Sequence, residues 1–246
     1  MTGTRDEKST GTLYGIGVGP GDPELLTLKA ARILSNSRCI YLPTSRLSTQ
    51  SYVTEVVQHY ADDECEICLV TFSLTNDREQ RQEHWQQTAG EIAERLRAGQ
   101  DVTFVTLGDT LLYSTYIYLL RALRKQLPEA KIETVPGISS FSLAAALTNI
   151  PLGEGLQPLQ VIPAANDLGI IEVAIASGGG VVLMKIGRSL QDIITLLDRV
   201  DALDRSVFVS RSGLPDQRVE TNLKRLRGAD EKAGNLAVII VQGTET

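Results

Sequence analysis

The first 150 residues alternate between short apolar runs and segments that repeat apolar residues at helical spacing. Residues 102–107 (VTFVTL) are almost continuously apolar, which is typical of a strand covered on both faces of a parallel sheet. The next apolar segment places Ile117, Leu120 and Leu123 on one face of a helix. Alternating strands and helices are the pattern of a parallel sheet with helices packed on it. The sequence therefore predicts an N-terminal α/β domain over residues 12–150.

The alternation is interrupted at residues 149–158, where proline and glycine residues indicate a domain boundary. Further apolar runs follow at residues 159–162, 181–184, 207–210 and 236–241, with helical segments between the first three. The stretch after Arg211 is rich in turn-forming residues. We therefore expect a second, mixed α/β domain over residues 151–246, and two α/β domains in all.

Composition excludes several broad classes of protein. The 246 residues carry a formal net charge of −6, which argues against general binding to nucleic acid. No apolar run approaches the roughly 20 residues that a membrane span requires, and the N-terminus does not resemble a signal peptide. Three cysteines do not form a disulfide framework, so a reducing cytoplasm is the expected location.

Four glycines, Gly15, Gly17, Gly19 and Gly21, follow or end the first predicted strand. They do not match a dinucleotide-binding fingerprint, because the sixth position of that motif falls on Pro20 or Asp22. No acidic residue follows the second strand, and no phosphate-binding loop is present. The alternatives are a tight turn without a ligand and a turn that brings backbone close to a polar ligand. Asp22 is expected to cap a helix that begins at Pro23.

Two more glycine turns follow strands in the same half of the chain. Residues 107–110 (LGDT) follow the buried strand, and residues 135–140 (VPGISS) follow the next one. Each alone is compatible with a simple turn. Since ligands bind at the carboxyl ends of strands in open parallel sheets, three such turns together favour a ligand site.

Taken in order, these motifs resemble the tetrapyrrole methylase family. The resemblance rests on residues 17–23 (GVGPGDP), 25–27 (LLT), 108–109 (GD), 135–140 (VPGISS), 184–185 (MK) and 210–213 (SRSG), and covers about residues 12–243. Residues 41–43 (YLP) and 108–115 (GDTLLYST) are most similar to the branch that methylates carbon 20 of precorrin-2, without or with cobalt, in cobalamin biosynthesis.

The resemblance implies a homodimer of two-domain chains, with S-adenosylmethionine and an anionic tetrapyrrole in the cleft between the domains. Apolar side chains would enclose the adenine and the thioether, while Asp109 and two serines would hold ribose or amino-acid groups. The family's cofactor contacts correspond to Pro20, Leu107, Gly108, Asp109, Leu112, Ser139, Ser140, Met184, Gly213 and Ala237.

Two positions depart from the family pattern. The usual Gly-Asp-Pro reads Gly108-Asp109-Thr110 here, which predicts a less rigid turn. Uroporphyrinogen methylases carry an aspartate after the second strand, where this chain has Leu42 and Pro43. That difference disfavours the uroporphyrinogen branch.

Methyl transfer from a sulfonium needs no covalent nucleophile, in keeping with a chain that holds only two histidines. A proton acceptor is expected, and Tyr113 is a candidate by its position. A substrate bordered by carboxylates predicts basic side chains near the motifs. The candidates are Arg46, Lys185, Arg188 and Arg211, whereas Lys224, Arg225 and Arg227 are expected on a solvated surface.

Cys65 and Cys68 have CxxC spacing, but residues i and i+3 of a strand point to opposite faces. His59 and Cys39 are the remaining residues of the types that could complete a zinc site. Without a second CxxC or a spaced histidine pair, we expect structural cysteines and no protein-bound metal. A cobalt ion, where present, would belong to the substrate.

Three alternatives to carbon-20 methylation stay open on the sequence. In the first the substrate is uroporphyrinogen III, and in the second it is the diphthamide precursor on elongation factor 2. Family members also methylate ribosomal RNA, which the acidic charge disfavours. The third alternative is a catalytically silent module that binds S-adenosylmethionine and no nucleic acid or membrane.

Overall fold

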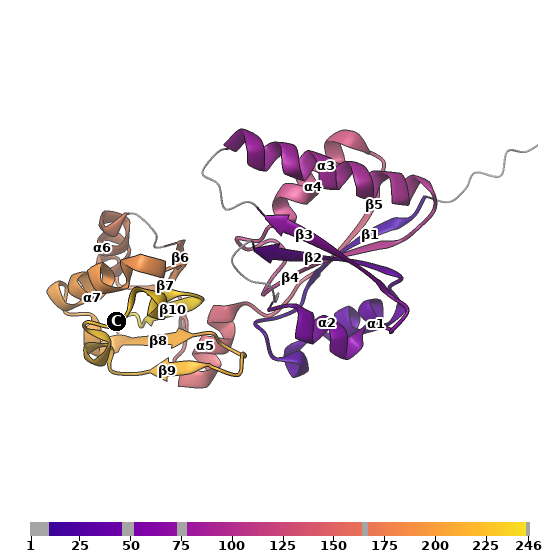
Figure 1. Ribbon diagram of the computed structural model, residues 1–246. Coiled ribbons are helices and arrows are strands. Elements are labelled where there is room, and N and C mark those ends of the chain that lie inside the picture. The colour runs from indigo at the N-terminus through magenta and orange to yellow at the C-terminus, as the bar shows by residue number, and fades with distance from the viewer. Residues whose placement is uncertain (1–9, 46–51, 73–77, 164–166, 245–246) are drawn as a thin grey trace, which may run out of the picture. The chain divides into compact units, whose positions relative to one another are not determined.

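A computed structural model describes residues 10–45, 52–72, 78–163 and 167–244 (Figure 1). Contacts divide the chain into two compact units, Met1–Ile138 and Ser139–Thr246. The boundary between the units lies before the proline- and glycine-containing segment at 149–158, where the sequence indicates one. The reason is that helix α5 (Ser140–Thr148) packs against strands of the second unit. Each unit is built on its own five-stranded sheet.

The sheet of the first unit is entirely parallel, as the sequence pattern predicts. Its strand order is β3-β2-β4-β1-β5, which places β1 at the centre of the three strands that precede the glycine turns. The register aligns Ile16 of β1 with Val105 of β4 and Val135 of β5. The strands are β1 (Thr12–Gly17), β2 (Cys39–Ser45), β3 (Glu66–Phe72), β4 (Val102–Thr106) and β5 (Lys131–Val135).

Helices cover both faces of this sheet, α3 and α4 on one and α1 and α2 on the other (Figure 1). Side chains alternate accordingly along β2, where Cys39 and Tyr41 face α3 while Ile40 and Leu42 face α1 and α2. Among the described residues, no helix has the length and apolar character that a bilayer-spanning segment needs. The helices are α1 (Leu28–Asn36), α2 (Thr54–Tyr60), α3 (Arg78–Arg97) and α4 (Tyr116–Gln126).

The connection from β1 into α1 corrects one expectation. Asp22 does cap a turn, since its carboxylate accepts a hydrogen bond from the Glu24 amide at 2.9 Å, but that turn is only the 3-10 segment Pro23–Leu25. The α-helix begins at Leu28, where the Thr27 hydroxyl accepts from the Ala30 amide at 3.2 Å. Thr27 is thus a second capping residue, and a new helix, α1, begins after it.

The second unit has a mixed sheet in the order β6-β7-β10-β8-β9. Helices α6 and α7 cover one face, and α5 packs on the other through Ala144. Strand β10 runs antiparallel to both β7 and β8, so its first residues lie beside the last residues of those strands. The elements are β6 (Leu159–Pro163), α6 (Leu168–Ala176), β7 (Gly180–Met184), α7 (Leu190–Arg199), β8 (Ser206–Ser210), β9 (Arg218–Glu220) and β10 (Ala237–Val241).

Candidate active site

The three glycine turns lie side by side at the carboxyl edge of the first sheet. They follow β1, β4 and β5, which are neighbours in the parallel sheet and therefore end at the same edge. Gly19 and Gly108 form an isolated two-bond bridge, with N···O distances of 3.2 and 2.6 Å. Within the first unit, the three turns therefore meet at one edge of the sheet.

The backbones of the three turns approach too closely for side chains at two positions. A Cβ atom on Gly17 would lie 2.6 Å from both the Gly108 oxygen and the Gly137 nitrogen. A Cβ atom on Gly137 would lie 2.1 Å from the same Gly108 oxygen. Gly108 itself has a φ of +72°, and a Cβ atom there would meet no atom within 4 Å. The absence of a side chain at Gly17 and Gly137 thus allows the three turns to pack against one another. The space that a Cβ atom of Gly108 would occupy is open.

Asp109 links the second turn to the third. One oxygen of its carboxylate accepts from the Leu111 amide at 2.9 Å, and the other accepts from the Gly137 amide at 3.1 Å. A carboxylate has further lone pairs, so these bonds leave capacity for a ligand. Asp109 is therefore first a positioning residue for the turns.

Thr110, which stands where the family carries proline, is almost fully buried. Its hydroxyl donates to the Val135 carbonyl at 3.5 Å, a long bond to the end of β5. Threonine at this position therefore replaces the proline ring with a buried side chain that is hydrogen-bonded to the neighbouring strand β5. Of the expected apolar contacts near these turns, Pro20 is buried and Leu107 and Leu112 are half-buried.

The first glycine of the series has a role in the core. A Cβ atom on Gly15 would lie 2.1 Å from the ring of Tyr116, a fully buried residue of α4. The Tyr116 hydroxyl is 3.0 Å from the Thr134 hydroxyl on β5, which holds the ring over β1. Gly15 thus makes room for an aromatic ring, whereas Gly17 makes room for another turn.

In the second unit, the expected residues Met184 and Ala237 lie at one edge of the sheet. Met184 ends β7 opposite Val238, and Ala237 begins β10 opposite Ser210. Met184 is half-buried, and Ala237 is buried.

The serine side chains next to this sheet differ in their hydrogen bonds. Ser139 caps α5, its Oγ accepting from the Ser142 amide at 3.3 Å, and Ser140 is the first helical residue. Ser212, which precedes the expected contact Gly213, is 3% exposed. Within the described residues, its Oγ has no hydrogen-bond partner. A buried hydroxyl without a partner is the kind of group that a polar ligand satisfies.

Several expected functional residues have a left-handed backbone. Tyr113, Lys185 and Arg211 have φ values of 54°, 54° and 55°. For residues with a side chain this conformation costs about 1–3 kcal/mol, and such strain is concentrated at functional sites. Asn149, Asp201 and Leu236, which are not candidate site residues, share this conformation with φ values of 52°, 53° and 50°.

The basic candidates differ in their environment. Arg211 pairs with Asp216, and this ion pair lowers the pKa of the aspartate. Lys185 follows β7 directly, and Arg188 lies in the 3-10 turn Gly187–Ser189. Arg46 lies outside the described residues. As expected for a solvated surface, Lys224, Arg225 and Arg227 pair with Asp204, Glu220 and Asp198 at 2.9, 3.8 and 2.6 Å.

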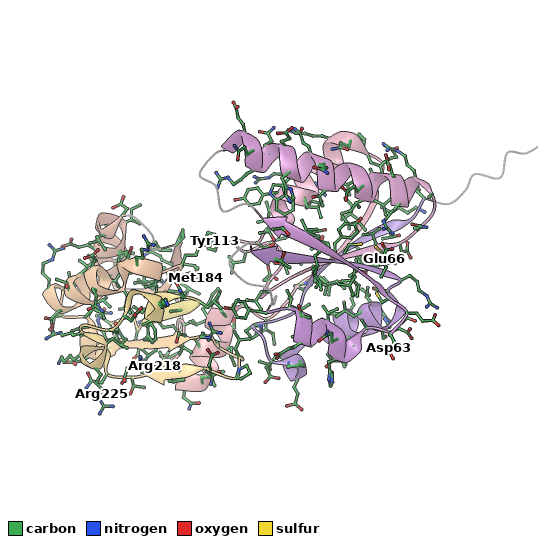
Figure 2. All side chains as sticks on the ribbon, viewed as in Figure 1. Asp63, Glu66, Tyr113, Met184, Arg218 and Arg225 are labelled. Carbon is green, nitrogen blue, oxygen red and sulfur yellow. The ribbon has the colours of Figure 1, made fainter. Side chains whose placement is uncertain are left out.

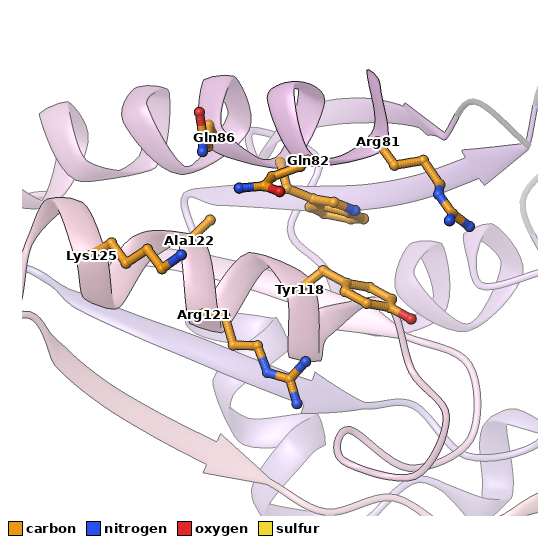
Figure 3. A pocket seen from close by; sticks show the side chains of 8 residues that line it. Arg81, Gln82, Gln86, Tyr118, Arg121, Ala122 and Lys125 are labelled. Carbon is orange, nitrogen blue, oxygen red and sulfur yellow. The ribbon is translucent and has the colours of Figure 1, made fainter. Parts of the chain in front are cut away.

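The sequence analysis missed a basic groove between α3 and α4 (Figure 3). Its volume is about 420 Å³, and Trp85 stacks on Tyr118 inside it with ring centroids 6.2 Å apart. The cations come from two helices far apart in the chain, so no local motif reveals them. The groove is lined by Arg81, Gln82, Trp85, Gln86, Tyr118, Arg121, Ala122 and Lys125.

Comparison with known proteins shows two relatives that are similar over most of the chain. A cobalt-precorrin-2 C(20)-methyltransferase from Salmonella typhimurium is 33% identical over 208 residues, covering 85% of this chain and 86% of the relative. A precorrin-2 C(20)-methyltransferase from Sinorhizobium is 29% identical over 242 residues, covering 95% and 96%.

The fold also matches solved structures. A uroporphyrin-III C-methyltransferase from Thermus thermophilus, complexed with S-adenosylhomocysteine, superposes with a TM-score of 0.65. It is 23% identical and covers 94% of this chain and 92% of its own, so the likeness concerns the fold. The family model of the tetrapyrrole (corrin/porphyrin) methylases matches residues 12–227. The chain belongs to the tetrapyrrole methylase family.

Proposed function

We propose that this protein transfers a methyl group from S-adenosylmethionine to carbon 20 of precorrin-2 or cobalt-precorrin-2 in cobalamin biosynthesis. The observation that carries the proposal is the match to two relatives named for this same carbon-20 transfer. One of them is 33% identical over 85% of the chain, and the other 29% identical over 95%. One name includes cobalt and the other does not, so both forms of the substrate belong in the test.

The residues present fit S-adenosylmethionine. In the first unit, the Cβ side of Gly108 is open, which allows a ligand to approach the backbone there. In the second unit, the buried Ser212 hydroxyl offers a polar group beside Gly213 and near Ala237. The predicted contacts Pro20, Leu107, Gly108, Asp109, Leu112, Ser139, Ser140, Met184, Gly213 and Ala237 would hold the cofactor.

The bound cofactor supplies a methyl group already activated on a sulfonium sulfur. The protein's task is then to align this methyl with the carbon that receives it and to exclude water. Asp109 contributes by keeping the second and third turns in register through its bond to the Gly137 amide. Half-buried Met184 and Leu112 provide apolar surface.

Tyr113 is proposed to take up the proton that the substrate carbon loses. Its ring is 40% exposed and its left-handed backbone is in keeping with a functional position. We expect Tyr113→Phe to lower kcat about 100-fold and to leave the Kd for S-adenosylhomocysteine unchanged. Steady-state kinetics and calorimetry measure both quantities. Tyr118→Phe, another exposed tyrosine, is the control, and equal kcat values for Tyr113→Phe and the parent would exclude the role.

Arg188 and Arg211 are proposed to bind carboxylates of the tetrapyrrole. A lost charge-assisted hydrogen bond costs about 1.5–3 kcal/mol, so Arg188→Ala and Arg211→Ala should each raise the substrate KM about 10- to 100-fold. The KM for S-adenosylmethionine should stay constant. Arg227→Ala removes the same charge from a surface ion pair and should change neither constant. An unchanged substrate KM in both test variants would assign the carboxylates to other cations, the basic groove among them.

A substrate panel distinguishes the proposed function from its alternatives. The purified protein and S-adenosylmethionine would be incubated without oxygen with precorrin-2, cobalt-precorrin-2, uroporphyrinogen III or elongation factor 2 that carries the diphthamide precursor. We expect a product one methyl heavier from the first pair and none from the others. Methylation of uroporphyrinogen III alone would replace the proposal, and S-adenosylhomocysteine binding without any product would indicate a silent module.

The protein is also proposed to act as a homodimer, as the family resemblance implies. Light scattering coupled to size-exclusion chromatography should give a mass near twice the 26.7 kDa of the chain. A mass of one chain at assay concentration would contradict this part of the proposal.

A further inference from the structure

A cluster of two thiols and one carboxylate lies on the face of the first sheet that α3 covers. In the register of β2 and β3, Cys39 is aligned with Glu66 and Tyr41 with Cys68. Cys39 and Cys68 are therefore diagonal neighbours on the same face, with their sulfurs 4.0 Å apart. The Cys68 sulfur is 3.4 Å from Oε1 of Glu66, and the ligand atoms of all three residues lie within 4.8 Å of one another.

These distances suit a shared metal ion better than a disulfide. A disulfide needs sulfurs about 2.05 Å apart and Cα atoms within about 7 Å. Diagonal neighbours on adjacent strands have Cα atoms about 7–8 Å apart, so a disulfide would require the backbone to move. Zinc–sulfur bonds of about 2.3 Å place two sulfurs of a tetrahedron roughly 3.8 Å apart. The thiols of Cys39 and Cys68 are already near that separation.

Arg95 of α3 completes the charge balance of the cluster. Its guanidinium donates to both oxygens of Glu66, at 2.7 and 2.6 Å, and lies 4.0 Å from the Cys68 sulfur. Two thiolates and one carboxylate carry three negative charges, which a divalent ion and Arg95 together neutralise. Each carboxylate oxygen has further lone pairs, so Oε1 can bind a metal ion while Arg95 keeps the carboxylate oriented, as outer-shell partners of metal ligands do.

The cluster is also accessible to an ion. Cys39 is 5% exposed, but Cys68 is half-buried and the Glu66 side chain is 52% exposed on β3, the edge strand of the sheet (Figure 2). The geometry points to a binding site for a thiolate-preferring divalent cation such as Zn²⁺, formed by Cys39, Cys68 and Glu66 with water as the fourth ligand. This proposal departs from the expectation of no protein-bound metal, which considered the pair Cys65 and Cys68 together with His59 and Cys39.

Metal binding at this site releases protons. Burial raises the pKa of Cys39, and burial together with neighbouring negative groups raises the pKa of Cys68 to about 12. Both thiols are therefore protonated at neutral pH, and binding replaces two S–H bonds with two S–metal bonds while two protons go to solvent. The other charged or titratable groups around the thiols are Tyr41, Cys65, Glu66, Glu91 and Arg95.

The test is a Co²⁺ titration of the full-length, untagged and fully reduced protein. The parent should develop thiolate-to-cobalt charge-transfer absorption that saturates at one ion per chain and disappears when Zn²⁺ is added. Cys39→Ser and Cys68→Ser should abolish the absorption, and Glu66→Gln should weaken binding about 10-fold. Cys65→Ser is the matched control, because its thiol lies outside the cluster, and should titrate like the parent.

A second readout separates metal binding from folding. Zn²⁺ should raise the Tm of the parent and of Cys65→Ser but not that of Cys68→Ser, whose half-buried position tolerates the change better than that of Cys39. Absence of the charge-transfer absorption in the parent would overturn the proposal. Absorption that persists in both Cys39→Ser and Cys68→Ser, or disappears in Cys65→Ser, would overturn it as well.

Discussion

Replacing Gly137 with alanine is expected to lower the affinity for S-adenosylhomocysteine at least about 100-fold. The added Cβ atom would lie 2.1 Å from the Gly108 oxygen and 2.7 Å from backbone atoms of Gly17, and backbone at these positions has no room to give way. The third turn would have to retreat, and its amide would lose the 3.1 Å bond to Asp109. Such overpacking also costs about 3 kcal/mol of stability. Calorimetry and chemical denaturation measure the two effects.

The matched control for Gly137→Ala is Gly90→Ala, in the middle of α3. A Cβ atom there meets only the flexible end of Gln126, at 3.3 Å, and alanine is the better helix former by about 1 kcal/mol. Gly90→Ala should bind S-adenosylhomocysteine like the parent and unfold at a slightly higher temperature. If Gly137→Ala also bound like the parent, the turns would not form the cofactor site.

Gly15→Ala is expected to be as destabilising, by about 3 kcal/mol, but for a different reason. Its Cβ atom would overlap the ring of Tyr116 and not another turn. The shorter side chain of Tyr116→Leu removes that ring, at an expected cost of about 3 kcal/mol for the lost packing and the bond to Thr134. The double variant should therefore be about 1–2 kcal/mol more stable than the sum of the single effects predicts.

The same cycle tests the division of roles among the glycines. Folded Gly15→Ala protein should keep the parent's affinity for S-adenosylhomocysteine, because Gly15 precedes the turn and packs against the core. Additive effects in the double variant would show that Tyr116 is not what excludes a side chain at position 15. A selective loss of cofactor binding would move Gly15 into the site.

The sheet and its carboxyl edge were predictable from sequence because both depend on local patterns. A continuously apolar strand such as 102–107 indicates burial on both faces of the sheet. A glycine turn after a strand indicates that another group approaches the backbone closely there. Parallel pairing then brings turns that are far apart in the chain to one edge. The tight contact of Gly17 with Gly137 depends on the order β4-β1-β5, which the motifs do not specify.

Features that depend on register or on two distant elements were not predictable. The CxxC spacing directed attention to Cys65 and Cys68, whereas the register of β2 on β3 brings Cys39 to Cys68. The basic groove is formed by two helices whose cations share no motif. The start of α1 was misjudged because Asp22 is a good cap for a turn that ends at Leu25.

The measurement that tests the central claim most directly is the position of the transferred methyl group. S-adenosylmethionine carrying a ¹³C-labelled methyl would be turned over with precorrin-2 and, separately, with cobalt-precorrin-2, without oxygen. Mass spectrometry and carbon NMR of the purified products should show one added methyl, attached to carbon 20. A methyl on another ring carbon, or no product while S-adenosylhomocysteine still binds, would contradict the account.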